Sequence, residues 1–534
     1  MPTSKPLALP VSARCAIVQT MTGTPALRLF LVCLTSVALA QAGCGGKKDK
    51  DKTRAKKAAS KTATAKSSKF ISADPKNNTR PAKKKPPLQN LATDTSKAAV
   101  KHVWSLRFGN KKRDNGRGIA IDSKGNIYMT GLFTGKVDFG NKKPVNSGKD
   151  LNVFLAKYNN EGTLQWVKSI GNKGEEDASA VTVDKDDNVI VAGLFSAQLR
   201  VAGKLLDAER KADNIFVAKW NSAGKPLWAR DFGADGNDVA HGLATDSAGN
   251  IILTGRYQQF IDFGKGKLRS NGNNEIFITK LTPGGDLMWA RSIGALHDDV
   301  GRAVAVDVQD NIYLGADITT RTMLDGKKLD IKGQTDAGVI KLDPNGKVLW
   351  ATTWGGAFQE ILVSLAVDPA GGVIAAGGFK DKMVINGETY KSKGNSDAFV
   401  VKLDTHGKIQ WVRAWGDRYK DIAAGVSVNK FGTIAVTGWF EREVNFGGGK
   451  RKSAGNKDIF LLKLDRDGKY MWDTEFGAKG DDIGRSVILG DDGVITLSGT
   501  FRFDVSFGGP TLESAREIDR KLPAGDAFLA RFAP

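Results

Sequence analysis

Short apolar runs, separated by turn residues, recur along the chain from residue 102 onwards. Residues 118–131 (GIAIDSKGNIYMTG) and 242–255 (GLATDSAGNIILTG) each hold two such runs around a central Asp and Gly, which is typical of a β-hairpin. A third run follows in every unit, as in residues 214–220 (NIFVAKW), and a fourth run contains a tryptophan. The pattern therefore predicts four strands in each unit rather than helices.

One tryptophan marks each unit at a nearly constant interval. Successive members of this tryptophan series lie 62, 62, 61, 61, 61 and 61 residues apart: Trp104, Trp166, Trp228, Trp289, Trp350, Trp411 and Trp472. A four-stranded unit of this length cannot bury both faces of its sheet alone, so neighbouring units must stack. A β-propeller satisfies this requirement, and about 22 residues between the second and third strands leave room for a small extra hairpin.

The two ends of the repeat region complement each other. The last unit ends in residues 527–534 (AFLARFAP) without a tryptophan strand, whereas the first unit is preceded by an extra one in residues 102–109 (HVWSLRFG). We predict that this N-terminal strand pairs with the last blade, because closing the ring removes two exposed sheet edges. The predicted fold of residues 102–534 is all-β, a seven-bladed β-propeller of four-stranded antiparallel blades.

The repeated motif also resembles a known family. An acid eight residues before D-x-x-G-N-(I/V), then D-x-F-(V/L)-x-K-L, then x-G-x-x-x-W, is similar to the SBBP repeat of bacterial cell-surface and secreted proteins. The resemblance covers residues 102–534 and implies a seven-bladed β-propeller and an exported bacterial protein. It implies no particular activity, because the family is defined by its repeat and a fold does not specify a reaction.

The net charge of +21 is concentrated at the beginning of the chain. Residues 47–101 carry 17 Lys or Arg and four acids, residues 1–46 carry three cations, and the other 433 residues hold a net charge of only +5. A basic segment beside a nearly balanced domain favours an electrostatic tether over a nucleic-acid groove. We expect residues 45–101, rich in Lys and Ala and poor in apolar residues, to form a disordered tether.

Residues 1–44 have the plan of an export segment, in which Met21 is an alternative start. An apolar stretch from Leu29 to Ala42 follows Arg28 and is too short for a membrane-spanning helix. It ends in Ala-Gly-Cys, which resembles the bacterial lipobox, and this resemblance implies that Cys44 is lipidated. The predicted location is the outer membrane or cell surface, with the lipid anchor holding the protein on the membrane.

One departure from the lipobox leaves a second interpretation open. Gln41 stands where the motif usually has Leu. Ordinary signal cleavage after Ala40 would instead give a soluble periplasmic or secreted protein.

Cysteine and histidine usage restricts the chemistry of the folded part. All three cysteines, Cys15, Cys33 and Cys44, lie in the first 44 residues, so the repeats contain no thiol. The four histidines, His102, His241, His297 and His406, show no spacing typical of a metal site. We therefore predict no catalytic residue, no metal and no cofactor, with calcium as the one ion that deserves a test.

An acid recurs eight residues before the turn position in all seven units. We call this set the acid column: Asp114, Glu176, Asp238, Asp299, Glu360, Asp421 and Asp482. Each member precedes the innermost strand, so the column is expected near one mouth of the central channel. It either binds a cation or caps backbone N–H groups where the chain crosses between blades, and its presence in every unit favours the capping role.

Three further series have structural interpretations. The turn acids are explained by hairpin chemistry, since Asn429 and Gly490 replace them in the last two units: Asp122, Asp184, Asp246, Asp307 and Asp368. The third strand carries a cation in every unit, expected to run its stem over apolar neighbours with its charge in water: Lys157, Lys219, Lys280, Lys341, Lys402, Lys463 and Arg531. The tryptophan series is expected to fill the core between blades.

Features that break the repeat are the better candidates for function. Two of the tryptophans outside the series, Trp354 and Trp415, stand in the aromatic-Gly motif. All four are candidates for a binding surface: Trp220, Trp354, Trp415 and Trp439. The seventh unit also carries an insertion around residues 512–525. Loops of this kind on a symmetric scaffold often carry the function.

Two hypotheses about function follow. The first is a monomeric binding or scaffolding module for a protein or glycan, with no nucleic-acid partner. The alternative is a propeller enzyme with its site in the central channel, of the quinone-dehydrogenase, lyase or hydrolase kind. A catalytic site needs residues that only one or two blades hold. The candidates are His241, after Asp238, and His297, before Asp298 and Asp299.

Overall fold

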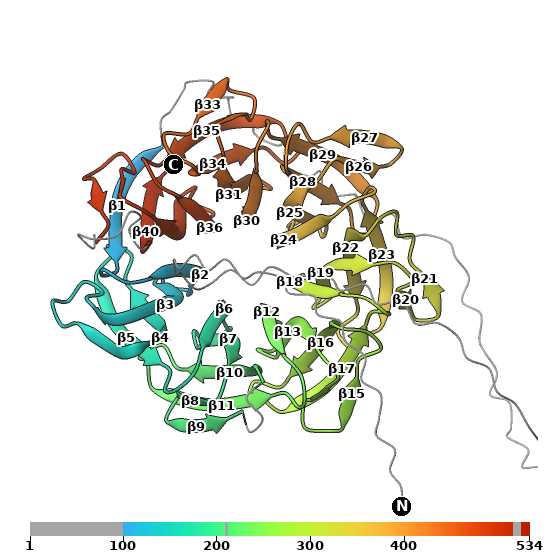
Figure 1. The fold of residues 1–534 in the computed structure, drawn as a ribbon, viewed down its shortest axis with the longest axis horizontal. Helices are drawn as coiled ribbons and strands as arrows, with labels where there is room; N and C mark the ends of the chain where they lie inside the picture. The colour runs from blue at the N-terminus through green and yellow to red at the C-terminus, as the bar shows by residue number, and fades with distance from the viewer. Residues whose placement is uncertain (1–99, 209–211, 516–524) are drawn as a thin grey trace, which may run out of the picture. The chain divides into compact units, whose positions relative to one another are not determined.

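The computed structural model describes residues 100–208, 212–515 and 525–534, and every regular element in these ranges is a β-strand. Seven four-stranded antiparallel sheets surround a central axis as the blades of a propeller (Figure 1). The prediction of an all-β, seven-bladed β-propeller is confirmed. In blades 1 to 6 the chain forms the innermost strand first and the outermost strand last.

From the innermost strand outwards, blade 1 is β2 (Asn115–Ile121), β3 (Ile127–Val137), β4 (Val145–Tyr158) and β5 (Leu164–Ile170), and blade 2 is β6 (Glu176–Val183), β7 (Val189–Phe195), β10 (Asn214–Trp220) and β11 (Pro226–Phe232). Blade 3 is β12 (Val239–Thr245), β13 (Ile251–Tyr257), β16 (Glu275–Leu281) and β17 (Leu287–Ile293). Blade 4 is β18 (Val300–Val306), β19 (Ile312–Thr319), β22 (Thr335–Leu342) and β23 (Val348–Trp354). Blades 5 and 6 are β24 (Glu360–Val367), β25 (Val373–Phe379), β28 (Asp397–Leu403) and β29 (Ile409–Trp415); and β30 (Ile422–Val428), β31 (Ile434–Phe440), β34 (Asp458–Leu464) and β35 (Tyr470–Phe476).

Blade 7 combines the two ends of the propeller. Its strands are β36 (Ile483–Leu489), β37 (Ile495–Phe501), β40 (Asp526–Ala533) and, outermost, β1 (Lys101–Phe108). Strand β1 pairs antiparallel with β40, with Arg107 opposite Phe528, and Figure 1 shows the blue β1 beside the red β40. The predicted closure of the ring by the N-terminal strand is confirmed.

The predicted extra hairpin lies between the second and third strands of each blade. Six blades have a separate two-stranded sheet: β8 (Gln198–Val201) with β9 (Lys204–Asp207), β14 (Phe260–Asp262) with β15 (Lys267–Arg269), β20 (Met323–Leu324) with β21 (Lys327–Lys328), β26 (Lys382–Ile385) with β27 (Glu388–Lys391), β32 (Glu443–Asn445) with β33 (Lys450–Lys452), and β38 (Asp504–Val505) with β39 (Leu512–Glu513). In blade 1 the hairpin is instead an extension of β3 and β4.

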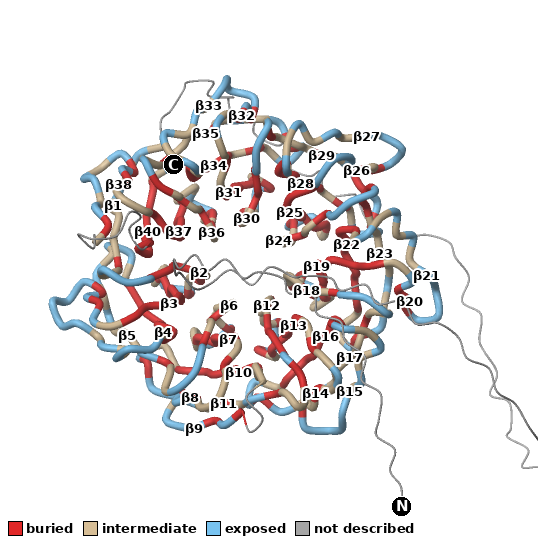
Figure 2. Tube along the Cα trace, viewed as in Figure 1, coloured by how far each residue is buried: buried red, intermediate tan, exposed pale blue. Residues whose placement is uncertain are grey.

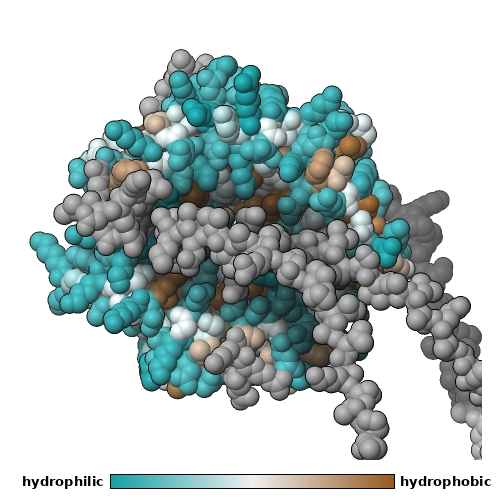
Figure 3. Space-filling model, in the orientation of Figure 1, coloured by the Kyte–Doolittle hydropathy of each residue, from teal (hydrophilic) through white to brown (hydrophobic). Residues whose placement is uncertain are grey.

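The hydrophobic core lies between adjacent blades. One cluster joins Tyr128 and Leu155 of blade 1 to Val191 and Phe216 of blade 2, and comparable clusters follow around the ring. Figure 2 shows buried positions along the strands and exposed positions in the outer loops. On the face drawn in Figure 3 the rim is mainly hydrophilic and hydrophobic residues show nearer the centre. Each blade is therefore stabilised by its neighbours, as stacked repeats require.

Several sequence predictions concern residues outside the described ranges. These are the export segment with Cys44, the tether up to residue 99, and residues 516–524 of the seventh-unit insertion. In the described ranges, no helix has the length and apolar character needed to cross a membrane.

Candidate functional site

Each innermost strand places its acid-column residue at the entrance to the blade. The Asp299 carboxylate accepts the Ala295 N–H at 2.9 Å and the Thr319 N–H at 2.7 Å. Asp482 accepts the N–H groups of Ala478 and Arg502 in the same way. All seven acids are at most 2% exposed. Each of the five aspartates thus ties the loop entering its blade to the end of the second strand, whereas Glu176 and Glu360 accept only a loop N–H, from Asn172 and Gly356.

Burial changes the acidity of this column. It raises the pKa of Asp114 and Asp482 to about 7 and that of Asp238 and Glu360 to about 8, against weaker opposing effects of the backbone hydrogen bonds. Within the described ranges, no three His, Cys, Asp or Glu side chains form a group that could hold a metal ion. The seven acids therefore act one by one, each as an acceptor for backbone N–H groups.

Sequence reasoning missed a second set of buried acids beside the column. The third strand begins with an acid in five blades, and each is at most 3% exposed: Glu275, Asp336, Asp397, Asp458 and Asp526. Asp458 raises the pKa of Asp482 in the next blade, after the larger effect of burial. The glycine of the aromatic-Gly motif, such as Gly477, lies so close that a Cβ there would overlap the Asp458 carboxyl group. The Asp of the repeated D-x-F motif is the sequence signal for this set.

The structure corrects the prediction that the third-strand cations hold their charges in water. Lys219 and Lys280 are 3% and 4% exposed, so their charges do not lie in water. Lys280 Nζ lies 2.8 Å from the Asp246 carboxylate of its own blade and donates to Pro344 O of the next blade at 3.1 Å. We call this ion pair a lysine bridge. It recurs where the turn acid is present, because that carboxylate supplies the counter-charge the buried ammonium needs.

The tryptophan series also links blades by hydrogen bonds. The Trp289 indole N–H donates to Pro344 O at 3.2 Å, in the hairpin between the third and fourth strands of the next blade. We call this bond a tryptophan bridge, and six of the seven series members make one: Trp104, Trp166, Trp228, Trp289, Trp350 and Trp411. Gly346 of that hairpin has φ +83° and packs against the Trp289 ring, where a side chain would clash. The series therefore both fills and hydrogen-bonds the interfaces.

Two of the tryptophans outside the series are buried between blades. Trp220 and Trp354 are 2% and 1% exposed and belong to interblade clusters, which corrects the expectation for them. Trp354 and Trp415 pair with the start of the third strand at the position that Ile293 and Phe476 fill elsewhere. Only Trp439 lies along the channel wall.

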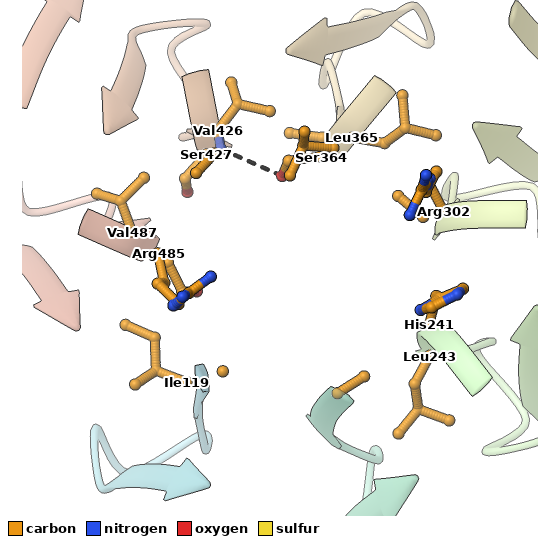
Figure 4. A pocket seen from close by; sticks show the side chains of 18 of the residues that line it. Ile119, His241, Leu243, Arg302, Ser364, Leu365, Val426, Ser427, Arg485 and Val487 are labelled. Atoms are coloured by element: carbon orange, nitrogen blue, oxygen red, sulfur yellow. Dashed lines mark hydrogen bonds between the residues drawn. The ribbon is translucent and has the colours of Figure 1, made fainter. Parts of the chain in front are cut away.

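The central channel forms a cavity of about 550 Å³ lined by the innermost strands (Figure 4). Each of these strands has a β-bulge three residues after its acid-column residue, as at His241 between Ala240 and Gly242. A bulge leaves its residue out of the ladder and redirects the side chain. The bulge residues, one per blade, line the channel: Arg117, Ser179, His241, Arg302, Val363, Ala424 and Arg485. We call these seven residues the bulge column, and their side chains differ in charge and size between blades, unlike those of the acid column.

The charged part of the bulge column has few partners. Arg117 and Arg302 contact Asp177 and Asp317 at 2.6 Å, whereas the Arg485 side chain has no ion pair or hydrogen bond with another described residue. Burial and nearby Arg117 lower the pKa of Arg485 to about 10. Burial, together with nearby Arg302, lowers the pKa of His241 to about 3. The imidazole is therefore neutral at pH 7 beside cationic neighbours.

The two histidines considered for catalysis do not come together at one site. His241 lies on the channel wall, whereas His297 lies in the exposed loop before β18 and is not among the residues that line the cavity. Asp238, Asp298 and Asp299 do not line the cavity either. Sequence reasoning identified His241 but missed the three arginines, although all four stand three residues after an acid-column member.

Exposed apolar residues gather in the loops that enter blades 4 to 6. Leu296, Phe358 and Tyr419 are 55%, 40% and 40% exposed and stand at nearly equivalent positions in successive loops. Arg442 lies over the Tyr419 ring, 5.5 Å from its centroid, and Lys380 lies 5.7 Å from the Phe358 centroid. A groove of about 560 Å³ between blades 6 and 7 includes Tyr419 and Arg442 in its walls. We call Leu296, Phe358 and Tyr419 the loop patch.

Comparison with known proteins supports the repeat. A model of the β-propeller repeat SBBP matches residues 103–132. An uncharacterised WD repeat-containing protein, L264, of Acanthamoeba polyphaga mimivirus is 21% identical over 546 residues, which cover 83% of this chain and 39% of that protein. The regulatory protein FlaEY of Caulobacter vibrioides is 26% identical over 198 residues, 35% of this chain and 20% of its own. The chain thus spans well under half the length of these relatives.

The solved structures to which the chain is similar match it at low sequence identity. The WD40 domain of Neurospora crassa Pan2 is 11% identical with a TM-score of 0.40, covering 80% of this chain and 96% of that one. The polysaccharide lyase Uly1 is 10% identical with a TM-score of 0.41, covering 81% and 100%. The strand topology and the repeat match together define the chain as a β-propeller repeat protein.

Proposed function

We propose that this protein is an exported lipoprotein, anchored to the cell envelope through Cys44, whose propeller is a binding or scaffolding module for a protein partner. One observation carries the binding role: the loop patch gathers exposed apolar side chains on one face of a ring whose repeated residues stabilise its own interfaces. Aromatic residues with arginine beside them are enriched where proteins bind one another. Most of the repeated acids, lysines and tryptophans have structural partners within or between the blades.

The experiment places a photo-crosslinking amino acid at Phe358 or Tyr419 in the full-length protein in intact cells. The matched control is Phe431, which is 57% exposed and follows β30, whereas Tyr419 precedes the same strand at its opposite end. We expect one discrete crosslinked protein from the loop-patch positions and none from position 431. Equal products from both faces, or only crosslinks to polysaccharide, would contradict the proposal of a protein partner.

The anchor has its own test. Mass spectrometry of the mature N-terminus should find an acylated Cys44, and Cys44→Ser should move the protein from the membrane fraction to the soluble fraction. An unmodified N-terminus after Ala40 would instead support a soluble exported protein, while leaving the loop patch untouched.

A channel enzyme is the second candidate, because the bulge column is asymmetric. His241 is neutral, its Nε2 atom is buried without a hydrogen-bond partner, and arginines of other blades surround it. These groups can bind and polarise a substrate, as a catalytic channel requires. The test is a screen of intact protein against lyase and hydrolase substrates with His241→Gln as the control. Activity that persists in this variant would remove the channel from consideration.

A further inference from the structure

The bulge column carries arginine in blades 7, 1 and 4, histidine in blade 3 and apolar residues in blades 5 and 6. Arg485 of blade 7 lies across the channel from His241 of blade 3 and Arg302 of blade 4 (Figure 4). Arg117 of blade 1 adds a third guanidinium, and no carboxylate of a described residue lines the cavity. The equivalent residues of blades 5 and 6 are Val363 and Ala424.

The fold does not require Arg485. Val363 and Ala424 occupy the same bulge in two blades whose strands and register match those of the others. Arg117 and Arg302 offset the charges of Asp177 and the buried Asp317, whereas Arg485 is half-buried without an ion pair to a described residue. Such a cation costs free energy that a small apolar residue at the bulge would avoid, so Arg485 needs a reason beyond folding.

Three buried donor or acceptor atoms of residues that line the channel lack partners among the described residues. Arg117 Nε, Arg485 Nε and His241 Nε2 make no hydrogen bond with any described residue. Asp177 and Asp317 balance Arg117 and Arg302 from outside the cavity, which leaves the charge of Arg485 without an ion pair. Guanidinium groups with free N–H donors suit carboxylate and phosphate oxygens.

The cavity also accommodates an apolar group. Val363, Leu365, Val426 and Trp439 line it, and the hydroxyl oxygens of Ser364 and Ser427 accept the backbone N–H groups of Val426 and Leu489. The cavity volume of about 550 Å³ is within the range of small-molecule sites.

From these observations we infer that the channel binds a small organic anion, with its carboxylate or phosphate group held by Arg485 and the neighbouring Arg117 and its apolar body against Val363 and Trp439. This site is separate from the loop patch and does not depend on the proposed protein partner. It needs no metal and no bond rearrangement: the ligand supplies the anionic oxygens that the arginine donors lack.

The experiment is isothermal titration calorimetry of the full chain at pH 7 and low salt with four probes. Phenyl phosphate and benzoate carry both an anion and a ring, inorganic phosphate carries only the anion, and benzyl alcohol carries only the ring. We expect saturable binding of phenyl phosphate or benzoate, at least about tenfold weaker binding of inorganic phosphate, and none of benzyl alcohol.

Variants locate the site. Arg485→Gln should weaken phenyl phosphate or benzoate binding at least about tenfold, since one charged hydrogen-bonding group is lost. Arg200→Gln, at an exposed position of β8, is the matched control and should bind as the native chain does. Arg485→Gln should also melt at the same or a higher temperature, because it removes a buried charge without an ion pair.

Three results would overturn the inference: no saturable binding of either aromatic anion to the native chain, equal binding of benzyl alcohol, or binding unchanged in Arg485→Gln. The first result requires only the calorimetry of the native chain. Each is independent of crosslinking at Phe358, so failure of the anion site and failure of the docking face can be told apart.

Discussion

The interface between blades 3 and 4 and the interface between blades 6 and 7 are built from the same repeat but are held differently. Between blades 3 and 4, Lys280 pairs with Asp246, and both Lys280 and Trp289 donate to Pro344 O. Between blades 6 and 7, Asn429 replaces the turn acid, and neither Lys463 nor Trp472 makes a bridge to a described residue. Burial lowers the pKa of Lys463.

The tryptophan bridge is missing between blades 6 and 7 because blade 7 contains the two ends of the propeller. A tryptophan bridge needs the hairpin between the third and fourth strands of the next blade, and in blade 7 that hairpin is replaced by the two ends of the propeller, at β40 and β1. The acid column persists there, and the Asp482 N–H still donates to Lys457 O of blade 6 at 2.8 Å. The comparison separates a backbone bond that recurs at the interfaces with an acid-column aspartate from the tryptophan bridge, which depends on an unbroken hairpin.

Removing β1 should have the largest effect. Deletion of residues 101–108 opens blade 7, exposes the edge of β40 and removes the Trp104 bridge to blade 1. We expect a loss of more than about 5 kcal/mol and unfolding of all blades together, measured by urea denaturation and hydrogen exchange. Protection that persists in blades 2 to 5 would show that the blades are stable without closure.

Raising the pH should weaken all seven interfaces together. Because burial raises the pKa of acid-column members to about 7 or 8, the folded state binds more protons than the unfolded state between pH 4 and 8. The free energy of unfolding therefore falls as the pH rises through this window, by on the order of 5 kcal/mol in total. Thermal melts at pH 5 and pH 8 measure it, and Asp482→Asn should reduce the slope. Stability that rises toward pH 8 would contradict these shifts.

Exchanging the turn residues of blades 3 and 6 tests the lysine bridge. Asp246→Asn keeps the turn acceptor, as Asn429 does, but leaves the buried Lys280 without a counter-charge and should cost about 3–5 kcal/mol. Asn429→Asp should stabilise by up to about 1 kcal/mol by giving Lys463 a partner. Urea denaturation measures both. Equal and small effects would mean that the bridge contributes nothing to stability.

The smallest effect separates ring packing from the indole hydrogen bond. Trp289→Phe and Trp472→Phe remove similar ring volume, but only the first removes a tryptophan bridge. We expect Trp289→Phe to cost about 1 kcal/mol more, again by denaturation. If the two substitutions cost the same, the series acts through packing alone.

The repeat made the fold predictable. The 61- or 62-residue interval fixed seven units, the turn signals gave four strands in each, and the missing and extra tryptophan strands at the two ends predicted β1 against β40. The site was less predictable. The sequence predicts the Lys280 charge in water, because a strand alone does not show that Asp246 of its own blade and Pro344 of the next blade lie beside it.

The sequence by itself determined the periodic properties of this protein: the number of blades, their strands and the closure, because each depends on spacing along the chain. Only the tertiary structure decided which side chains meet. The bulge column shows why, since Arg117 and Arg485 are 368 positions apart in the sequence and share one channel wall only when seven inner strands converge on a single axis.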